Sequence, residues 1–179
     1  MRAEASDRSE MVNQLLPGDI VELVERREKW SLVQAEYDGY RGWVDNKQYT
    51  PFEDAASLAE GLFLGSPYLW GGRSVAGIDC SGLTQVCFKA CGIWLPRDAS
   101  QQATCGVEVC TCDPQRNDLA FFRNAEGRII HVGICMGEGR IIHSSGQVRI
   151  DRLDSHGILM SDGSYSHRLS SVRRLSEFS

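Results

Sequence analysis

Cys80 is the residue of this sequence whose position best fits covalent chemistry. It follows Asp79 and precedes Ser81 and Gly82, at the start of a predicted helix that runs from Cys80 to Cys91. The thiolate is the nucleophilic form of cysteine, and the N-terminus of a helix lowers the pKa of a thiol because it favours negative charge. A buried cysteine that only packs in an apolar core is the alternative, and position alone favours neither interpretation.

Two histidines supply the base that such a nucleophile needs. His131 and His143 lie in two alternating segments that flank residues 137–139, a Gly-Glu-Gly run typical of a hairpin loop. A three-residue loop predicts that the two side chains face each other directly, with Cβ atoms about 4.5–5.5 Å apart. Such a pair suits a base that receives the thiol proton and a second group that fixes the tautomer of the base. For either histidine alone, a hydrogen-bonded structural role in the sheet is the alternative. His156 and His167 are predicted to be surface residues.

The elements that position these residues follow an N-terminal β region. Asp19–Glu25, Trp30–Tyr37 and Tyr40–Asp45 alternate apolar and polar residues, and Asp38-Gly39 between the last two is a strong hairpin signal. Pro17-Gly18 marks a turn before the first segment. Several short strands with tight turns indicate a small barrel.

The pattern changes to helical near Phe52, which divides the chain into a predicted domain of residues 1–52 and a second of residues 53–179. Apolar residues then recur at helical spacing, at Ala55, Leu58, Ala59 and Leu62. The helix at Cys80 has Asp79 as its predicted cap and Gly92 just past its end. Asp98 is predicted to cap a short helix through Gln101 and Gln102, after which strands are predicted over Leu119–Phe122, Ile129–Cys135, Arg140–His143 and Arg168–Leu175.

The composition argues against a nucleic-acid-binding protein and against a membrane protein. The net charge of −5 over 179 residues gives no reason to expect binding to nucleic acid or to an anionic membrane. No apolar run approaches the length of about 20 residues that a membrane span needs. The N-terminus lacks the apolar core of a signal peptide, which favours a cytoplasmic location. Oligomeric state is not indicated.

The seven cysteines leave at least one thiol without an intrachain partner. Cys105, Cys110 and Cys112 lie close together but have neither a C-x-x-C pair nor a histidine at a usual zinc spacing. Reduced structural thiols are therefore expected, with no metal and no other cofactor.

Five motifs, in order along the chain, resemble those of the NlpC-type cell-wall cysteine peptidases: Pro67–Gly82, Leu95–Gln102, Asn117–Phe122, His131–Ile134 and Ile142–Gly146. The resemblance implies an α+β, papain-like fold, in which a cysteine on a helix packs against an antiparallel sheet that carries the histidines. It implies that Cys80 is the nucleophile, His131 the base and His143 the orienting residue.

The same resemblance assigns three residues to the substrate. Tyr68 matches the tyrosine that precedes the nucleophile in this family and would form a hydrogen bond near the reacting centre. Asp79 and Ser81 would help to hold the substrate. All three lie in the first of the five motifs.

Residues 2–49 resemble a bacterial SH3-like domain, chiefly through Gly42-Trp43-Val44. In the subgroup whose SH3-like domain leans on the cleft, a free L-alanine amine is recognised. Similarity to that subgroup makes Glu10 and Tyr40 the candidates, because an ammonium needs an acid and often an aromatic face. A solvated glutamate and a half-buried barrel tyrosine are the alternatives.

The family hydrolyses the bond between γ-D-glutamate and a diamino acid in peptidoglycan stem peptides. The expected substrate is therefore a peptidoglycan-derived peptide, in particular a released peptide with a free N-terminal L-Ala. A wall-tethered endopeptidase of intact stems, an acyltransferase or amidase on the same scaffold, and a wall-binding module with an inactive second domain are the alternatives. Retention of Cys80, His131 and His143 argues against the last of these.

Overall fold

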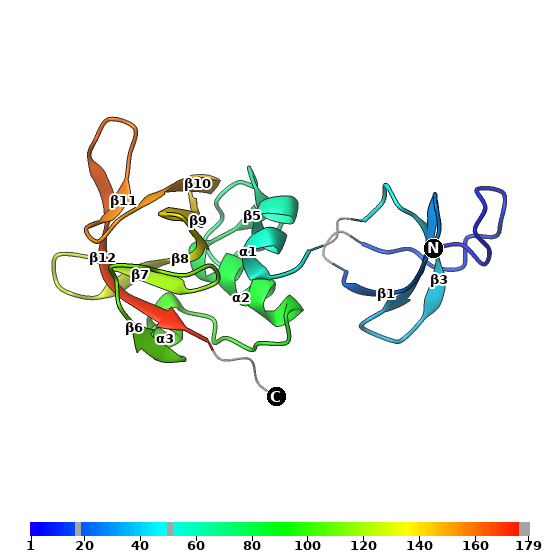
Figure 1. Cartoon of the computed structure of the whole chain (residues 1–179), viewed down its shortest axis with the longest axis horizontal. Helices are drawn as coiled ribbons and strands as arrows, with labels where there is room; N and C mark the ends of the chain where they lie inside the picture. The colour runs from blue at the N-terminus through cyan, green and yellow to red at the C-terminus, as the bar shows by residue number, and fades with distance from the viewer. Residues whose placement is uncertain (17–18, 50–51, 176–179) are drawn as a thin grey trace. The chain divides into compact units, whose positions relative to one another are not determined.

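The computed structural model describes residues 1–16, 19–49 and 52–175, and the chain folds as two compact units (Figure 1). The units comprise Met1–Pro51 and Phe52–Ser179. The predicted boundary after residue 52 lies one residue from this division. The turn predicted at Pro17-Gly18 lies outside the described residues.

The N-terminal unit contains a three-stranded antiparallel sheet in the order β1 (Val21–Arg26), β2 (Trp30–Ala35), β3 (Arg41–Asp45). The hairpin predicted at Asp38-Gly39 is confirmed, and Gly39 has a φ of 73°, a conformation that glycine adopts without steric cost. Arg2 forms isolated bridges with Trp43 and with Met11, so N-terminal residues extend the sheet beyond β3.

The C-terminal unit carries short helices. They are α1 (Ala55–Leu58), which continues into a π-helical turn η1 (Ala59–Phe63), α2 (Cys80–Ala90) and α3 (Ala99–Gln102). Asp54 caps α1 by accepting from the N–H of Ser57 at 2.8 Å. The predicted short helix after Asp98 is confirmed as α3, and the Gln101 side chain accepts from the Asp98 N–H at 3.2 Å. These local caps explain why each helix begins where it does.

The strands of this unit are β4 (Arg73–Ser74), β5 (Gly77–Ile78), β6 (Val107–Val109), β7 (Leu119–Arg123), β8 (Ile129–Gly137), β9 (Arg140–Ser145), β10 (Gln147–Leu153), β11 (Gly157–Leu159) and β12 (Tyr165–Arg174). The four strands predicted from the sequence are present as β7, β8, β9 and β12. The strands β6, β10 and β11 were not predicted. All pairings in the main sheet are antiparallel.

The strands β7 to β12 close into a ring. They pair in sequence order, β7 also pairs with β12, and the short strand β11 pairs with both β10 and β12. Because side chains alternate along each strand, one set points out of the ring and the other points into it. The helices lie together on one side of the strands in Figure 1 and cover part of the outer surface.

Two apolar clusters match the two surfaces of the ring. The outer cluster joins the helices to strand residues such as Phe121, Val132 and Ile134. The inner cluster consists of Ala120, Phe122, Cys135, Ile141, Leu153, Ile158 and Val172. A strand side chain therefore either meets the helices or lies inside the ring, and this decides which polar residues can meet each other.

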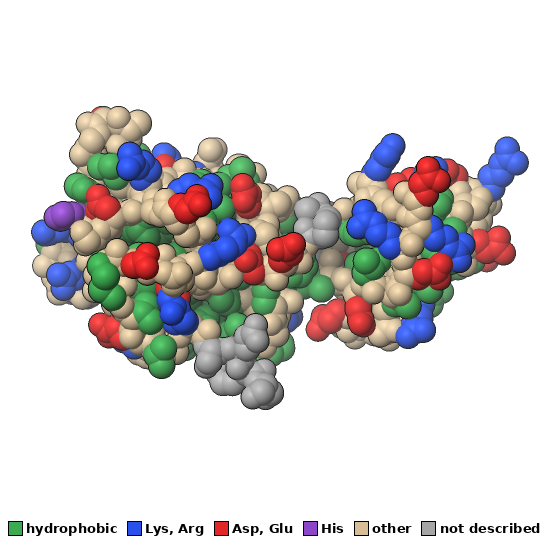
Figure 2. Space-filling view, viewed as in Figure 1, with side chains coloured by type: hydrophobic (Ala, Val, Ile, Leu, Met, Phe, Trp, Pro, Cys, Tyr) green, Lys and Arg blue, Asp and Glu red, His purple; other side chains and the backbone are tan. Residues whose placement is uncertain are grey.

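The surface carries acidic and basic side chains intermixed over the face of each unit that Figure 2 shows. Within the described part of the chain, no helix is long and apolar enough to cross a membrane.

Candidate active site

Cys80 is the first residue of α2, and Asp79 fixes the start of that helix. The Asp79 carboxylate accepts hydrogen bonds from the backbone N–H groups of Gly82 and Gly71, both at 2.7 Å. Arg97 donates to both of its oxygens, at 2.9 and 2.6 Å. Burial would raise the pKa of Asp79, but these bonds outweigh it and lower the pKa. The predicted cap is confirmed, and Arg97 is a neighbour to which the sequence analysis assigned no role.

The Cys80 thiol is buried, with 7% of the residue exposed. Burial raises its pKa and the charge of Asp79 adds to this effect, whereas the N–H groups of Val132 and Ser81 oppose it. The N–H of Ser81 at the helix start lowers the pKa, as predicted, but loss of hydration outweighs this effect, so the pKa of the thiol is raised overall. The contact with Val132 places the thiol beside β8, one residue from His131.

His131, His143 and Asp151 form a hydrogen-bonded row across the neighbouring strands β8, β9 and β10. His131 Nε2 lies 2.9 Å from His143 Nδ1, and His143 Nε2 lies 2.9 Å from Asp151 Oδ2. Both imidazoles are buried. The structure brings the two predicted histidines together, while their catalytic roles stay predictions. Asp151 was not predicted, since it lies on a strand that the sequence analysis missed.

The register between the two histidines differs from the prediction. His143 pairs with Gly133, and His131 lies two residues away along β8 on the same face. The turn consists of Glu138 and Gly139, and the register shifts at a bulge near the end of β8. The histidines therefore meet diagonally and not directly across the strands, which still keeps both on one face.

Gly133 leaves the space in which this diagonal contact forms. A Cβ at position 133 would lie 2.9 Å from the Cβ of His143 and 2.7 Å from Cδ1 of Ile141. Both neighbours are buried, so a methyl group there would push the His143 ring away from its present position. A glycine at position 133 is therefore needed for steric reasons, because a larger residue would displace His143.

His167 is half-buried and lies on β12, whereas it was predicted to be a surface residue. Its ring stacks on His131 with centroids 4.1 Å apart and planes inclined by 23°, and Phe122 meets it edge-on. Burial lowers the pKa of His167 to about 4, and the charge of His143 acts in the same direction. Burial, followed by the charges of His167 and His143, also lowers the pKa of His131 well below 6.5. Only His156 is exposed, as predicted.

Stability should therefore decrease in weak acid. A histidine of the unfolded chain titrates near pH 6.5, whereas His167 in the fold takes up a proton only near pH 4. Between these values the unfolded chain binds more protons, so the free energy of unfolding falls as the pH falls. His167→Phe keeps an aromatic ring and should reduce this loss, and His156→Phe should not. Urea unfolding at pH values about 0.5 apart, from pH 7 to pH 4, measures how the free energy of unfolding of each variant depends on pH. Equal slopes for wild type and His167→Phe would contradict the assignment.

Tyr68, Ser81 and Arg97 surround the start of α2. Burial raises the pKa of Tyr68, and the charges of Cys80 and Asp79 add to the shift, so the Tyr68 hydroxyl lies near both. Ser81 Oγ accepts a hydrogen bond from Arg97 Nη1 at 2.9 Å. The three predicted substrate residues of this unit, Tyr68, Asp79 and Ser81, are thus neighbours of the thiol.

Glu10 and Tyr40 belong to the N-terminal unit, and both are exposed. Neither side chain forms a hydrogen bond with another described residue, so both have free polar groups. Their proposed role in binding an ammonium stays a prediction.

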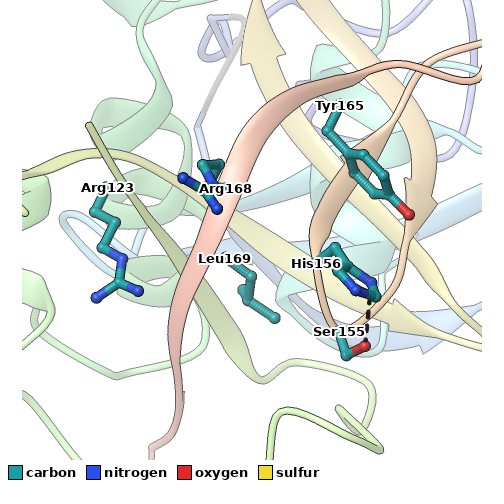
Figure 3. Close-up of a pocket in the computed structure, with 6 residues that line it drawn as sticks. All are labelled: Arg123, Ser155, His156, Tyr165, Arg168 and Leu169. Atoms are coloured by element: carbon teal, nitrogen blue, oxygen red, sulfur yellow. Dashed lines mark hydrogen bonds between the residues drawn. The ribbon is translucent and has the colours of Figure 1, made fainter. Parts of the chain in front are cut away.

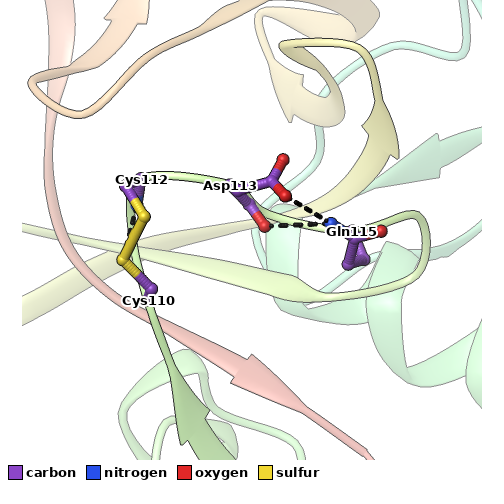
Figure 4. The surroundings of a disulfide bond; sticks show 4 residues. All are labelled: Cys110, Cys112, Asp113 and Gln115. Carbon is purple, nitrogen blue, oxygen red and sulfur yellow. Dashed lines mark hydrogen bonds between the residues drawn. A yellow bond between two sulfur atoms is a disulfide. The ribbon is translucent and has the colours of Figure 1, made fainter.

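The cysteines differ in one respect from the prediction of reduced thiols. Cys110 and Cys112 form a disulfide (Figure 4). The free cysteines are Cys80, Cys87, Cys91, Cys105 and Cys135. Among the described residues, no group of three or more histidine, cysteine or acidic side chains is arranged to hold a metal ion.

A surface pocket of about 310 Å³ lies elsewhere on the ring (Figure 3). Its lining consists of Arg123, Ser155, His156, Tyr165, Arg168 and Leu169. Neither Cys80 nor His131 contributes to it. The pocket is therefore separate from the candidate catalytic residues.

Comparison with known proteins identifies the group to which this site belongs. Residues 65–164, more than half of the chain, match the sequence profile of the NlpC/P60 family. The chain belongs to the NlpC/P60 family. This is a family of cysteine peptidases, so the predicted family is confirmed. Residues 1–48 match a second profile, described as the bacterial dipeptidyl-peptidase Sh3 domain.

Individual NlpC/P60 relatives agree with this assignment. The chain is 49% identical over 85 residues to the γ-D-glutamyl-L-lysine dipeptidyl-peptidase of Bacillus subtilis, a match that covers 46% of the chain and 29% of that protein. It is 43% identical over 84 residues to the bifunctional muramidase/DL-endopeptidase CwlT of the same organism, covering 45% of the chain and 26% of that protein. The chain thus spans less than a third of the length of these curated relatives.

A solved NlpC/P60 structure also resembles the protein. The structure of an NlpC/P60 family protein from Bacillus cereus superimposes with a TM-score of 0.61 at 31% identity, covering 86% of this chain and 53% of that one. The chain therefore shares its fold with a solved NlpC/P60 protein, and its short helices on an antiparallel sheet agree with the predicted α+β, papain-like class.

Proposed function

We propose that the protein is a cysteine peptidase that hydrolyses the γ-D-glutamyl–diamino acid bond of peptidoglycan-derived stem peptides. The observation that carries the proposal is that the Cys80 thiol, at a capped helix start, contacts the N–H of Val132, the residue that follows His131, in an NlpC/P60 domain. His131 in turn is hydrogen-bonded to His143 on the next strand. The names of the relatives support the substrate class.

The reaction would begin from a neutral thiol and a neutral imidazole, since burial disfavours both charged forms. The Cys80 proton moves to His131 as Sγ forms a bond to the γ-carbonyl carbon of D-glutamate. N–H groups at the start of α2 stabilise the oxyanion. The C–N bond then breaks as His131 gives the proton to the leaving amine. Water, deprotonated by the same imidazole, hydrolyses the thioester and restores the thiol.

The residues around the helix start would hold the glutamyl part of the substrate. Tyr68 and Ser81 have hydroxyl groups near the thiol. The Asp79 carboxylate already accepts five hydrogen bonds, from Gly71, Gly82, Ser81 and Arg97. We therefore assign Asp79 an indirect role, in which it holds the Arg97 guanidinium beside a substrate that is itself acidic.

The N-terminal unit would select peptides with a free L-Ala amine, through Glu10 and Tyr40. The profile match to a dipeptidyl-peptidase Sh3 domain and the relative named a dipeptidyl-peptidase support this form of the activity. A dipeptidyl-peptidase needs to recognise the chain end, and an exposed carboxylate and a phenol ring suit an ammonium.

N-acetylation of L-Ala-γ-D-Glu-diaminopimelate should therefore reduce kcat/KM. Acetylation removes the charge that Glu10 pairs with, and loss of one charge-assisted hydrogen bond costs about 1.5–3 kcal/mol, or roughly ten- to a hundredfold. Mass-spectrometric digests of the free and blocked peptides measure the ratio. Glu10→Gln should remove most of the discrimination while the blocked peptide is cleaved as before.

Glu22→Gln is the matched control, since it changes an exposed glutamate on β1 of the same unit. It should preserve the discrimination. Equal cleavage of free and blocked peptides by the wild type would favour the second candidate, an endopeptidase of intact stems. The relative named a DL-endopeptidase is the observation that supports that candidate.

A further inference from the structure

Asp151 occupies the end of a diagonal row of polar side chains. On β9, His143 pairs with Gly133 of β8 on one side and with Arg149 of β10 on the other. His131 lies two residues from Gly133, and Asp151 lies two residues from Arg149 in the opposite direction. The three functional groups therefore lie on one line across three strands, and all belong to the same face of the sheet.

The charge of Asp151 is held in place by Arg149. Arg149 donates from Nη2 to Asp151 Oδ1 at 2.8 Å, and its Nε lies 2.6 Å from Oδ2. Burial would raise the pKa of Asp151, but the bonds with Arg149 and His143 lower it. An ionised carboxylate only accepts hydrogen bonds. The nitrogen of His143 that faces Asp151 must therefore carry the hydrogen.

The hydrogen on Nε2 of His143 also determines which nitrogen of His131 carries a hydrogen. If Nε2 of neutral His143 carries the hydrogen, its Nδ1 has a lone pair and can only accept. Nε2 of His131 must then be the donor, because it faces that lone pair at 2.9 Å. A neutral imidazole has one hydrogen, so Nδ1 of His131 is left with a lone pair. Among the described residues, that nitrogen has no hydrogen-bond partner.

We propose that Asp151 is a positioning residue that sets the ring tautomers of His143 and His131 and so presents Nδ1 of His131 as the acceptor of the Cys80 proton. The proposal rests on the proposed function for its kinetic consequence. Its structural consequence, the tautomer of each ring, does not depend on any activity.

Asp151→Asn changes this constraint with little change in volume. An amide can donate as well as accept, so it can bond to His143 with the opposite tautomer. His143 Nδ1 would then carry a hydrogen. His131 Nε2 would carry the lone pair that accepts it, so His131 Nδ1 would carry a hydrogen and could no longer accept a proton. A carboxylate in Asp151→Glu keeps the original constraint.

Nitrogen NMR of ¹⁵N-histidine protein at neutral pH tests the structural part, since a bare ring nitrogen and an N–H nitrogen have different chemical shifts. The chain has 4 histidines, so the spectrum is small. Wild type should show bare Nδ1 atoms in both His131 and His143, and Asp151→Asn should change the tautomer of at least one. A hydrogen on Nδ1 of His143 in the wild type, or unchanged tautomers in Asp151→Asn, would overturn the proposal.

Kinetics tests the functional part. Asp151→Asn should lower kcat for the free tripeptide by at least about tenfold with little change in KM, because Asp151 is proposed to act through His143 and not on the substrate. Asp151→Glu should retain more activity than Asp151→Asn. Asp162→Asn, a change of an exposed loop carboxylate, should leave kcat unchanged. Asp151→Asn with wild-type kcat would also overturn the proposal.

Two further measurements separate a failure of the tautomer proposal from a failure of the proposed function. If Asp151→Asn does not fold, the wild-type spectrum still tests the proposal, because a hydrogen on Nδ1 of His143 would overturn it. The acid limb of the kcat/KM profile should move in Asp151→Asn, because His131 is faced by His143, His167 and the charged pair behind them. A wild-type protein with the predicted tautomers but no peptidase activity would refute the proposed function alone.

Discussion

Cys80→Ala should lower kcat/KM for L-Ala-γ-D-Glu-diaminopimelate by at least about 10⁴-fold, since no other described group near the helix start can form the thioester. The fold should persist. The change removes one sulfur atom from a position at the edge of the outer core, and Asp79 still caps α2 through the N–H of Gly82. Product release measured by mass spectrometry and thermal unfolding followed by circular dichroism check the two halves of the prediction.

Cys87→Ala is the matched control for this experiment. Cys87 lies on the same helix and is fully buried, and burial raises the pKa of its thiol. Its replacement should lower the melting temperature through a small cavity and leave kcat near the wild-type value. Cys80→Ser should be as inactive as Cys80→Ala, because a buried alcohol is a much weaker nucleophile. Normal turnover by Cys80→Ala, or loss of turnover only in Cys87→Ala, would sink the assignment of the nucleophile.

Local features of the fold were predictable because their causes lie within a few residues. Asp79 caps α2 and Gly39 closes a hairpin, and each of these features depends on neighbours in the sequence. The same holds for α3, where Gln101 returns a hydrogen bond to the N–H of Asp98. Strands with continuous apolar runs, such as β7 and β8, were also found, because both of their faces are buried.

Features set by pairing between distant strands were not predictable. The direct pairing expected of His131 and His143 was wrong for a simpler reason: a loop of residues 137–139 places His143 opposite Gly133, and the two-residue turn with its one-residue bulge gives the same register. The position of His167 depends on closure of the ring through β11, a strand of three residues whose register with β12 shifts between Ile158 and Leu159. Asp151 was missed for a related reason, since the charged residues of β10 hide its alternation.

The error about the thiol pKa has a different origin. The helix start was predicted correctly, but the sequence did not show that Cys80 would be buried. Burial raises the pKa of the thiol and lowers that of His131. In the proposed mechanism the proton therefore moves from the thiol to the imidazole during attack on the carbonyl. The orientation of the His131 ring therefore matters more than it would in a preformed ion pair.

His131→Ala should accordingly lower kcat/KM by about 10²–10⁴-fold, the range expected when a general base is removed. His143→Ala should cost less, about ten- to a hundredfold, because it removes a hydrogen bond to the base and leaves the base itself in place. In that variant the ring of His131 still stacks on His167 and contacts Phe122, which limits its rotation.

The two variants should also differ in how activity depends on pH. In His143→Ala the acid limb of kcat/KM should remain, since His131 still titrates, and its low pKa should keep the limb below pH 6.5. In His131→Ala that limb should disappear, because no described imidazole would remain beside Val132 and the thiol. His156→Ala, which alters an exposed ring in the separate surface pocket, should match the wild type in both rate and pH profile. An inactive His143→Ala together with a nearly normal His131→Ala would show that the roles of base and orienting group are reversed.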